Sequence, residues 1–225
     1  MKVAYAEDRK MKLTEILQSI PSQEGLKIVH DGVTYNRPYQ NFFYEGQEIK
    51  GLREMKDRFA LLKGISEETP AKKYLDVGCN MGYFVRRFSE SFEEVNGVDY
   101  DSFYNSFAKM VYPQLSNVFK LADLNASRLT SMFSVDSFDF ITSLSMIEYI
   151  DNKQAFLSDL FSLLKQGGIC VIEGHSMDIN LGHDETYEKL IRQQPWKVER
   201  LSVRTDNGLN APHNAMGRPV WLCRK

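Results

Sequence analysis

The chain has 225 residues and a formal net charge of −2, with 26% charged and 43% hydrophobic residues. This length suffices for one sizeable domain with an added cap, and the near-neutral charge excludes a global positive field that would attract nucleic acid or an anionic membrane. No apolar stretch is long enough to span a bilayer, and the N-terminus lacks the apolar core of a signal peptide, so we expect a cytoplasmic protein without a membrane partner. Three widely spaced cysteines, Cys79, Cys170 and Cys223, predict buried thiols rather than a disulfide framework.

Residues 1–70 are predicted to form an N-terminal helical cap or lid. Apolar residues recur at helical spacing from Leu13 to Ile20. Residues 22–40 predict a loop with a turn at Asp31-Gly32, and a helical pattern resumes over residues 41–63.

The polar face of this last pattern carries Arg53, Lys56, Asp57 and Arg58. A solvated helix face is the simpler interpretation. The alternative is that Tyr39, Arg53 or Arg58 leans over a ligand site as part of a lid.

Residues 71–225 alternate between strand and helix patterns and are expected to form one α/β domain. The expected strands are residues 73–77, 94–98, 117–121, 138–143, 169–172, 197–203 and 220–223. The expected helices are residues 82–92, residues 184–194 and two segments between them. The first of these segments is capped by Asp101 and stops before Pro113. The second begins at a capping box of Asp151 and Gln154 and ends at Gly167-Gly168. Five strand–helix units in succession predict a doubly wound, mostly parallel sheet with helices on both faces.

Polar residues lie at the carboxyl ends of five predicted strands: Asp76, Asp99, Asp123, Ser143 and Glu173. Ligands of doubly wound sheets bind at these ends, near the switch in strand order. The pattern therefore predicts a binding site as well as a fold.

Residues 73–84 predict a buried strand that turns through Gly78 and Gly82 into a helix, which is typical of a nucleotide-binding unit. Glycines there let the backbone approach a ligand, and the helix N-terminus is partly positive. Asp99 lies 21 residues beyond Gly78, the spacing at which an acidic residue accepts hydrogen bonds from ribose hydroxyls.

The first loop favours a cationic ligand over a pyrophosphate. The carboxylate of Asp76 stands beside it, and Tyr83 and Phe84 occupy the region where a dinucleotide-binding loop has its helix-packing glycine. A carboxylate at this point suits an ammonium or a sulfonium group. S-adenosylmethionine combines both with adenine and ribose.

Residues 72–174 resemble the class I S-adenosylmethionine-dependent methyltransferases, which have a Rossmann-like fold. The segments that carry the resemblance are, in order, LDVGCNMGYF, VNGVDYD, LADLN, FDFITSLSMIEYI and LLKQGGICVIEG, with Asn80 where many members have a glycine. The resemblance implies S-adenosylmethionine as cofactor, Asp99 on the ribose, Asp123 near the adenine amino group with Leu124 beside it, and an antiparallel C-terminal strand pair that completes a seven-stranded sheet. The residues expected to bind the cofactor are Asp76, Gly78, Cys79, Asn80, Gly82, Asp99, Tyr100, Asp123, Leu124, Ser143 and Arg58.

The segment after the fourth strand bears on the acceptor. It lacks the N/D-P-P-Y/F motif that is common in methyltransferases acting on base or protein amides. Glu148 and Tyr149 are candidates to orient or deprotonate a nucleophile, and His175 is a third catalytic candidate. The alternative role of Glu148 is that of a helix cap. The spacing of Glu173, His175 and His183 fits no strong zinc pattern, so no metal is expected.

Three functions remain open at this point, and a fourth is disfavoured. The favoured one is methyl transfer to an O or N nucleophile of a small or medium-sized acceptor. The others are methylation of RNA or protein, which the near-neutral charge opposes, and a non-catalytic cofactor-binding regulatory domain. The first loop disfavours a nicotinamide-dependent oxidoreductase. The acceptor and the oligomeric state are left open.

Overall fold

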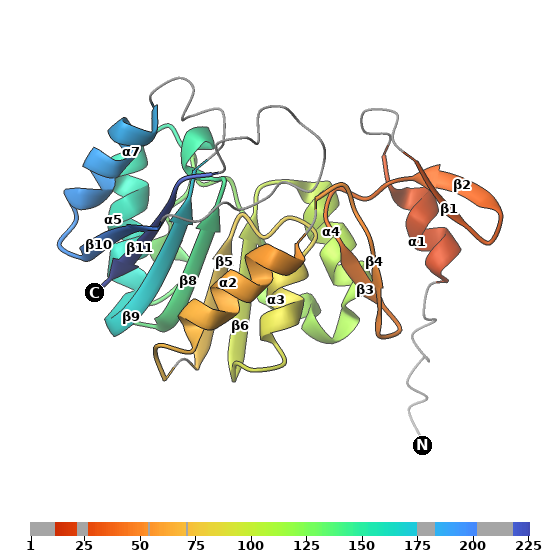
Figure 1. The fold of residues 1–225 in the computed structure, drawn as a ribbon, viewed down its shortest axis with the longest axis horizontal. Coiled ribbons are helices and arrows are strands. Elements are labelled where there is room, and N and C mark those ends of the chain that lie inside the picture. Colours follow the sequence, from red (N-terminus) through yellow and green to blue (C-terminus); the bar gives the residue numbers. More distant parts are fainter. Residues whose placement is uncertain (1–11, 22–26, 54, 71, 175–182, 202–217) are drawn as a thin grey trace, which may run out of the picture.

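A computed structural model describes the chain except for residues 1–11, 22–26, 54, 71, 175–182 and 202–217 (Figure 1). Its centre is a seven-stranded sheet of order β10-β11-β9-β8-β5-β6-β7. The strands are β5 (Lys73–Val77), β6 (Glu94–Asp99), β7 (Phe119–Leu121), β8 (Phe138–Leu144), β9 (Leu164–Glu173), β10 (Lys197–Leu201) and β11 (Val220–Arg224). Strands β7, β6, β5, β8 and β9 are parallel, and β11 is antiparallel to both β9 and β10. The predicted doubly wound sheet with an antiparallel C-terminal pair is confirmed.

Helices cover both faces of the sheet because side chains alternate between the faces along each strand (Figure 1). Tyr74 and Phe140 face a hydrophobic cluster that includes residues of α2 (Lys56–Ser66), α3 (Tyr83–Phe88) and α4 (Ser102–Val111). Leu75 and Ile141 face a second cluster with residues of α5 (Lys153–Leu163) and α7 (His183–Arg192). The strand–helix connections also contain the short 3₁₀ helices η1 (Pro113–Val118), η2 (Leu129–Ser131) and η3 (Ile147–Tyr149).

The N-terminal segment is not the helical cap that its sequence predicts. Helix α1 (Leu13–Ser19) is confirmed, but two hairpins follow, β1 (Lys27–His30) with β2 (Val33–Asn36) and β3 (Phe42–Tyr44) with β4 (Gln47–Ile49). Both hairpins turn through two residues of positive φ, which is the geometry that closes a tight β-hairpin. The helix expected over residues 41–63 is therefore the β3–β4 hairpin followed by α2.

This segment packs into the same hydrophobic cluster as the sheet. The Phe42 and Phe107 rings lie 5.3 Å apart in an edge-to-face contact, and both side chains are buried. A domain boundary near residue 70 stays a prediction.

The predicted start of α4 is confirmed, whereas both predicted limits of α5 change. Asp101 caps α4 as expected, because its side chain accepts hydrogen bonds from the backbone N–H groups of Phe103 and Tyr104. The cap of α5 is Asn152 rather than Asp151, and the expected Asp151–Gln154 capping box is wrong. Helix α5 ends at Leu163 rather than at the Gly167-Gly168 pair, which lies within β9.

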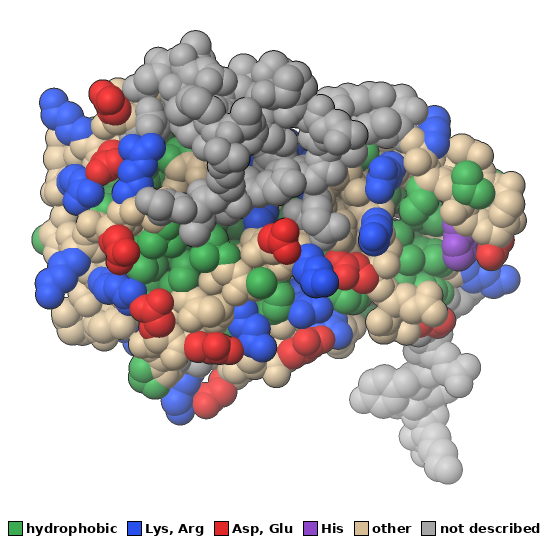
Figure 2. Space-filling model, in the orientation of Figure 1, with side chains coloured by type: hydrophobic (Ala, Val, Ile, Leu, Met, Phe, Trp, Pro, Cys, Tyr) green, Lys and Arg blue, Asp and Glu red, His purple; other side chains and the backbone are tan. Residues whose placement is uncertain are grey.

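Surface features fit the composition. No helix in the described ranges is long and apolar enough to cross a membrane. On the face that Figure 2 shows, the coloured basic and acidic side chains are interspersed rather than gathered into a patch of one sign. The described residues of this face form no extended basic surface for a nucleic acid backbone.

Candidate active site

The carboxyl ends of the parallel strands border two adjoining cavities. The first cavity, of about 220 Å³, lies between these ends and the N-terminal segment. Its lining is Tyr39, Gln40, Arg53, Met55, Arg58, Asp76, Gly78, Asn80, Phe84, Asp99, Tyr100, Tyr104, Leu144, Ser145, Met146, Tyr149 and Arg218. The second cavity, of about 310 Å³, is lined by Val98, Asp99, Tyr100, Ala122, Asp123, Leu124, Asn125, Met146, Tyr149 and Ile150.

Four residues, Asp99, Tyr100, Met146 and Tyr149, line both cavities. Each cavity alone is at or below the lower end of the usual range for ligand pockets, about 300–1,000 Å³. The arrangement therefore suits one elongated ligand that extends from the second cavity into the first.

The loop after β5 has three residues with positive φ, namely Gly78, Asn80 and Gly82. Asparagine is among the few side chains that adopt this conformation readily, which explains why Asn80 can stand where a glycine is common. Its side-chain oxygen accepts a hydrogen bond from the backbone N–H of Met81 at 2.9 Å.

Gly82 is packed closely against protein side chains, and its expected contact with the cofactor stays a prediction. A Cβ atom there would lie 2.8 Å from the ring of Phe119, and Gly82 lines neither cavity. Gly78 does line the first cavity, and a Cβ atom on it would meet the side chain of Met146.

Asp99 ends β6 at the junction of the two cavities, and its side chain is nearly buried. One carboxylate oxygen accepts the backbone N–H of Asn80 at 2.7 Å, and the other accepts that of Asp101 at 2.9 Å. Burial raises the pKa of Asp99, while these backbone hydrogen bonds oppose the rise. Each oxygen keeps lone-pair capacity for a ligand hydroxyl.

Asp76 ends β5 and lines the first cavity, although it is only 1% exposed. Its Oδ1 accepts a hydrogen bond from the Thr142 hydroxyl at 2.8 Å, and that hydroxyl is 2.6 Å from the Tyr74 hydroxyl. Its Oδ2 has no hydrogen-bond partner among the described residues. Burial raises the pKa of Asp76 to about 7, and the neighbouring Asp99 adds to the rise. A cation placed at Oδ2 would stabilise the ionised carboxylate.

The loop after β7 forms a wall of the second cavity. Asp123 accepts the backbone N–H of Asn125 at 2.9 Å. Asn125 in turn donates to the carbonyl of Tyr149 at 3.0 Å and accepts the N–H of Asp151 at 2.9 Å. These bonds connect the loop to the segment that carries Tyr149.

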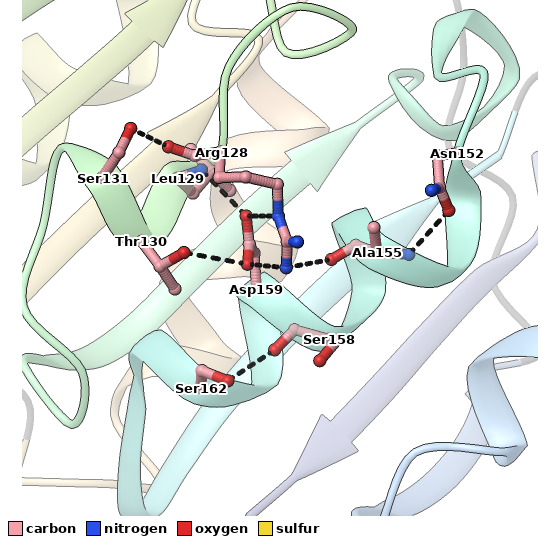
Figure 3. A network of polar contacts seen from close by, with 9 residues as sticks. All are labelled: Arg128, Leu129, Thr130, Ser131, Asn152, Ala155, Ser158, Asp159 and Ser162. Atoms are coloured by element: carbon pink, nitrogen blue, oxygen red, sulfur yellow. Dashed lines mark hydrogen bonds and ion pairs between the residues drawn. The ribbon is translucent and has the colours of Figure 1, made fainter.

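A buried carboxylate on α5 holds the continuation of this loop (Figure 3). Asp159 accepts hydrogen bonds from the Arg128 Nε at 2.8 Å, from the Leu129 backbone N–H at 2.9 Å and from the Thr130 hydroxyl at 3.2 Å. Because Asp159 is 2% exposed and its pair with Arg128 is charge-assisted, we expect it to fix the path of the loop.

A buried ion cluster lies at the end of β9. Glu173 accepts hydrogen bonds from Arg58 at Nε (3.2 Å) and Nη2, from Arg218 at Nη1 (3.4 Å) and from the Ser145 hydroxyl (3.1 Å). The side chains of Arg58, Glu173 and Arg218 are at most 8% exposed. The cluster ties α2, β9 and the segment before β11 together at the first cavity.

The structure brings most of the residues expected to bind the cofactor to the two cavities: Arg58, Asp76, Gly78, Asn80, Asp99 and Tyr100 line the first, and Asp123 and Leu124 line the second. Cys79 and Ser143 line neither. Cys79 is buried beside Gly97, which raises the pKa of its thiol well above the usual range, and Ser143 is fully buried within β8. A cofactor contact by Cys79, Gly82 or Ser143 has no support from these cavities.

The three catalytic candidates fall in different places. Tyr149 lines both cavities, whereas Glu148 lines neither, because its carboxylate oxygens are buried. His175 lies outside the described residues. His183 is exposed at the start of α7.

The solvated-face interpretation of Arg53 and Arg58 is wrong, because both line the first cavity together with Tyr39.

Sequence reasoning missed Gln40 and Arg218 as cavity residues. The backbone of Gln40 lies against Gly51, so close that a Cβ atom on Gly51 would lie 2.3 Å from the Gln40 carbonyl carbon. A glycine in a polar segment was the only sequence signal of that contact.

Comparison with known proteins agrees with this geometry. Residues 75–172 match the family described as a methyltransferase domain. This domain is of the class I S-adenosylmethionine-dependent methyltransferase type. S-adenosylmethionine is the cofactor of this family, and the matched residues run from β5 to β9, through the segments that form both cavities.

The individual relatives of this chain are distant. It is 22% identical to the malonyl-[acyl-carrier protein] O-methyltransferase of Bacillus cereus over 73% of this chain and 58% of the relative. It is 28% identical to phosphoethanolamine N-methyltransferase 1 of Arabidopsis thaliana over 76% of this chain and 36% of the relative. The chain thus spans 58% of the length of the first of these curated relatives and 36% of the second. A solved S-adenosylmethionine-dependent methyltransferase of Mesorhizobium loti has the same fold, with a TM-score of 0.59, 17% identity, and coverage of 74% of this chain and 96% of that one.

Proposed function

We propose that this methyltransferase transfers the methyl group of S-adenosylmethionine to an O or N nucleophile of a small or medium-sized acceptor. The observation that carries the proposal is the unpartnered Oδ2 of buried Asp76, which lies in the same cavity as Asp99. A buried oxygen without a partner is costly, and a cationic ligand would remove that cost. S-adenosylmethionine supplies an activated methyl group when it is bound.

The residues present fit each part of this cofactor. Asp76 offers a free carboxylate oxygen for the ammonium group, and Asp99 retains acceptor capacity for ribose hydroxyls. The second cavity has apolar walls from Leu124 and Ile150, which suit an adenine ring, and Asp123 lines the same cavity, where its carboxylate would accept a hydrogen bond from the adenine amino group.

Methyl transfer depends mainly on alignment of the nucleophile with the methyl group, and a base is needed only when the nucleophile must lose a proton. Tyr149 lines both cavities, where donor and acceptor would meet. Tyr149 is 63% exposed, but partial desolvation and the neighbouring Glu148 carboxylate raise the pKa of its hydroxyl, so this group keeps its proton at neutral pH. We assign Tyr149 the role of a hydrogen-bond donor that orients the acceptor.

The relatives support methylation without choosing the acceptor atom, since one is named an O-methyltransferase and the other an N-methyltransferase. A nucleic acid acceptor is opposed by the net charge of −2 and by the interspersed surface charges in Figure 2. Cytoplasmic residence remains our expectation from the sequence.

An acceptor screen tests the proposal. The purified chain is incubated with S-adenosylmethionine and a panel of small hydroxyl, carboxyl, phosphate and amine compounds, and products are detected by mass. We expect a product one methyl group heavier and equimolar S-adenosylhomocysteine with the wild type, and neither product with Asp99→Ala. Binding of S-adenosylmethionine without turnover of any acceptor would instead favour the non-catalytic alternative.

A further inference from the structure

Three arginines, Arg53, Arg58 and Arg218, line the first cavity together with Asp76 and Asp99. We infer that the acceptor carries an oxyanion, a carboxylate or a phosphate group, and that Arg53 binds this group in the first cavity. The inference rests on the proposed function, because it names the class of acceptor at the same site.

Arg58 and Arg218 lie close together at this end of the cavity. Both donate hydrogen bonds to the buried carboxylate of Glu173. Burial lowers the pKa of Arg218, and the charges of Arg58 and Arg53 lower it further, while Glu173 opposes the change. Positive charge is therefore concentrated at this end of the cavity.

Arg53 has no carboxylate partner among the described residues. Its guanidinium carbon lies 5.3 Å from the centroid of the Tyr39 ring, a cation–π contact that leaves the N–H donors of the guanidinium available. The side chain is half-buried at the cavity wall. A guanidinium with open donors in a cavity is well suited to bind a carboxylate or phosphate in a bidentate manner.

The backbone holds Arg53 firmly. Its N–H donates to the carbonyl of Tyr39 at 3.0 Å, and that of Leu52 donates to Pro38 at 2.8 Å. Gly51 permits this close approach, because any Cβ atom there would collide with the Gln40 backbone. The N-terminal segment thus presents Arg53 and Tyr39 on a rigid wall rather than on a free loop.

Arg53 is the arginine left for the acceptor. Arg58 and Arg218 are engaged with Glu173, whereas the Arg53 guanidinium has no carboxylate partner among the described residues. An anionic group of the acceptor would give this guanidinium a charged partner at the cavity wall.

Anion titrations test the assignment. Inorganic phosphate, acetate and, as a neutral probe, ethylene glycol are titrated separately into the wild type with and without saturating S-adenosylhomocysteine, with binding followed by NMR. We expect at least one anion to bind and ethylene glycol not to bind. The phosphate and acetate arms show which of the two groups the site prefers.

Three variants identify the residue. Arg53→Gln should weaken anion binding about tenfold or more, as expected for loss of a charged hydrogen-bond donor, and should change the affinity for S-adenosylhomocysteine less than twofold. Arg53→Lys should retain part of the anion affinity. Arg224→Gln is the matched control, because it removes the same charge from an exposed ion pair with Glu68 and should change neither affinity.

Any other pattern overturns the inference. If the wild type binds neither anion, or if Arg53→Gln binds them unchanged, Arg53 does not hold an acceptor oxyanion. If Arg53→Gln lowers the affinity for S-adenosylhomocysteine at least as much as that for the anion, Arg53 belongs to the cofactor. A wild type that binds no S-adenosylhomocysteine but binds the anion through Arg53 would refute the proposed function and not the anion site.

Discussion

Asp99 Oδ2 accepts the backbone N–H of Asn80 at 2.7 Å, so the end of β6 determines the shape of the loop that follows β5. The two strands are adjacent and parallel, which brings a residue of the second motif into direct contact with one of the first. The same carboxylate accepts the N–H of Asp101, the cap of α4. One buried side chain thus positions the loop, the next helix and the junction of the two cavities.

Substitutions at Asn80 test whether its left-handed conformation matters for the site. Asn80→Gly should retain cofactor affinity within a few-fold, because glycine adopts the same φ of 49° freely. Asn80→Val should lower the free energy of unfolding by about 1–2 kcal/mol and weaken cofactor binding, because a β-branched residue is strained there. Chemical denaturation and calorimetric titration measure the two effects. Equal behaviour of the two variants would contradict the role given to this backbone conformation.

Asp76→Asn should stabilise the chain without ligand above pH 7 and weaken cofactor binding. The folded-state pKa of about 7 lies above the ordinary value of 3.8, so the folded state holds its proton more tightly. Stability contributed by the protonated form is therefore present below about pH 4 and is lost as the pH rises toward 7, by up to about 4 kcal/mol. Urea denaturation at pH 5 and pH 8 should show a smaller pH dependence in the variant. An identical dependence in both proteins would contradict the burial effect.

Cofactor affinity should rise with pH between 5 and 7 and level off above 7. The cofactor ammonium favours the ionised form of Asp76, and below its pKa of about 7 each pH unit should change affinity by up to about tenfold. Arg58 lowers this pKa and Asp99 raises it, so both belong to the titrating environment. Isothermal titrations at several pH values provide the test, with Asp76→Asn as the control that should lose most of the slope. A flat wild-type profile would argue against an ammonium at this carboxylate.

Removing the buried anchor of the second-cavity loop should loosen that loop. Asp159→Ala leaves the Arg128 guanidinium and the Leu129 N–H without this partner, and we expect a loss of about 1–3 kcal/mol in stability. Amide hydrogen exchange should accelerate in residues 123–131, and cofactor affinity should fall a few-fold. Arg192→Gln, which breaks an exposed pair with Glu188, is the control. Unchanged exchange in the loop would show that Asp159 does not position it.

The central sheet could be predicted from the sequence because buried parallel strands appear as short apolar runs with polar residues at their ends. Strand β5 spans Lys73–Val77 as expected, and Asp76 and Asp99 reach the same edge because parallel neighbours end together. The cofactor side of the site could therefore be predicted from the sequence.

The N-terminal segment could not be predicted in the same way. Its two hairpins depend on positive φ at positions such as Asp31 and Glu45, whereas apolar residues after Asn41 happen to recur at helical intervals. Arg218 was missed for a different reason. It reaches Glu173 only because β11 lies beside β9, a contact between residues 45 positions apart that no local pattern reveals.

Calorimetric titration of the purified chain with S-adenosylmethionine and with NAD, for the wild type and for Asp99→Ala, tests the central claim most directly. We expect the wild type to bind S-adenosylmethionine at one site and to prefer it to NAD. We expect Asp99→Ala, shown by circular dichroism to be folded, to lose at least about tenfold in affinity for S-adenosylmethionine. Unchanged affinity for S-adenosylmethionine in Asp99→Ala, or a wild-type preference for NAD, would contradict the assignment of this site.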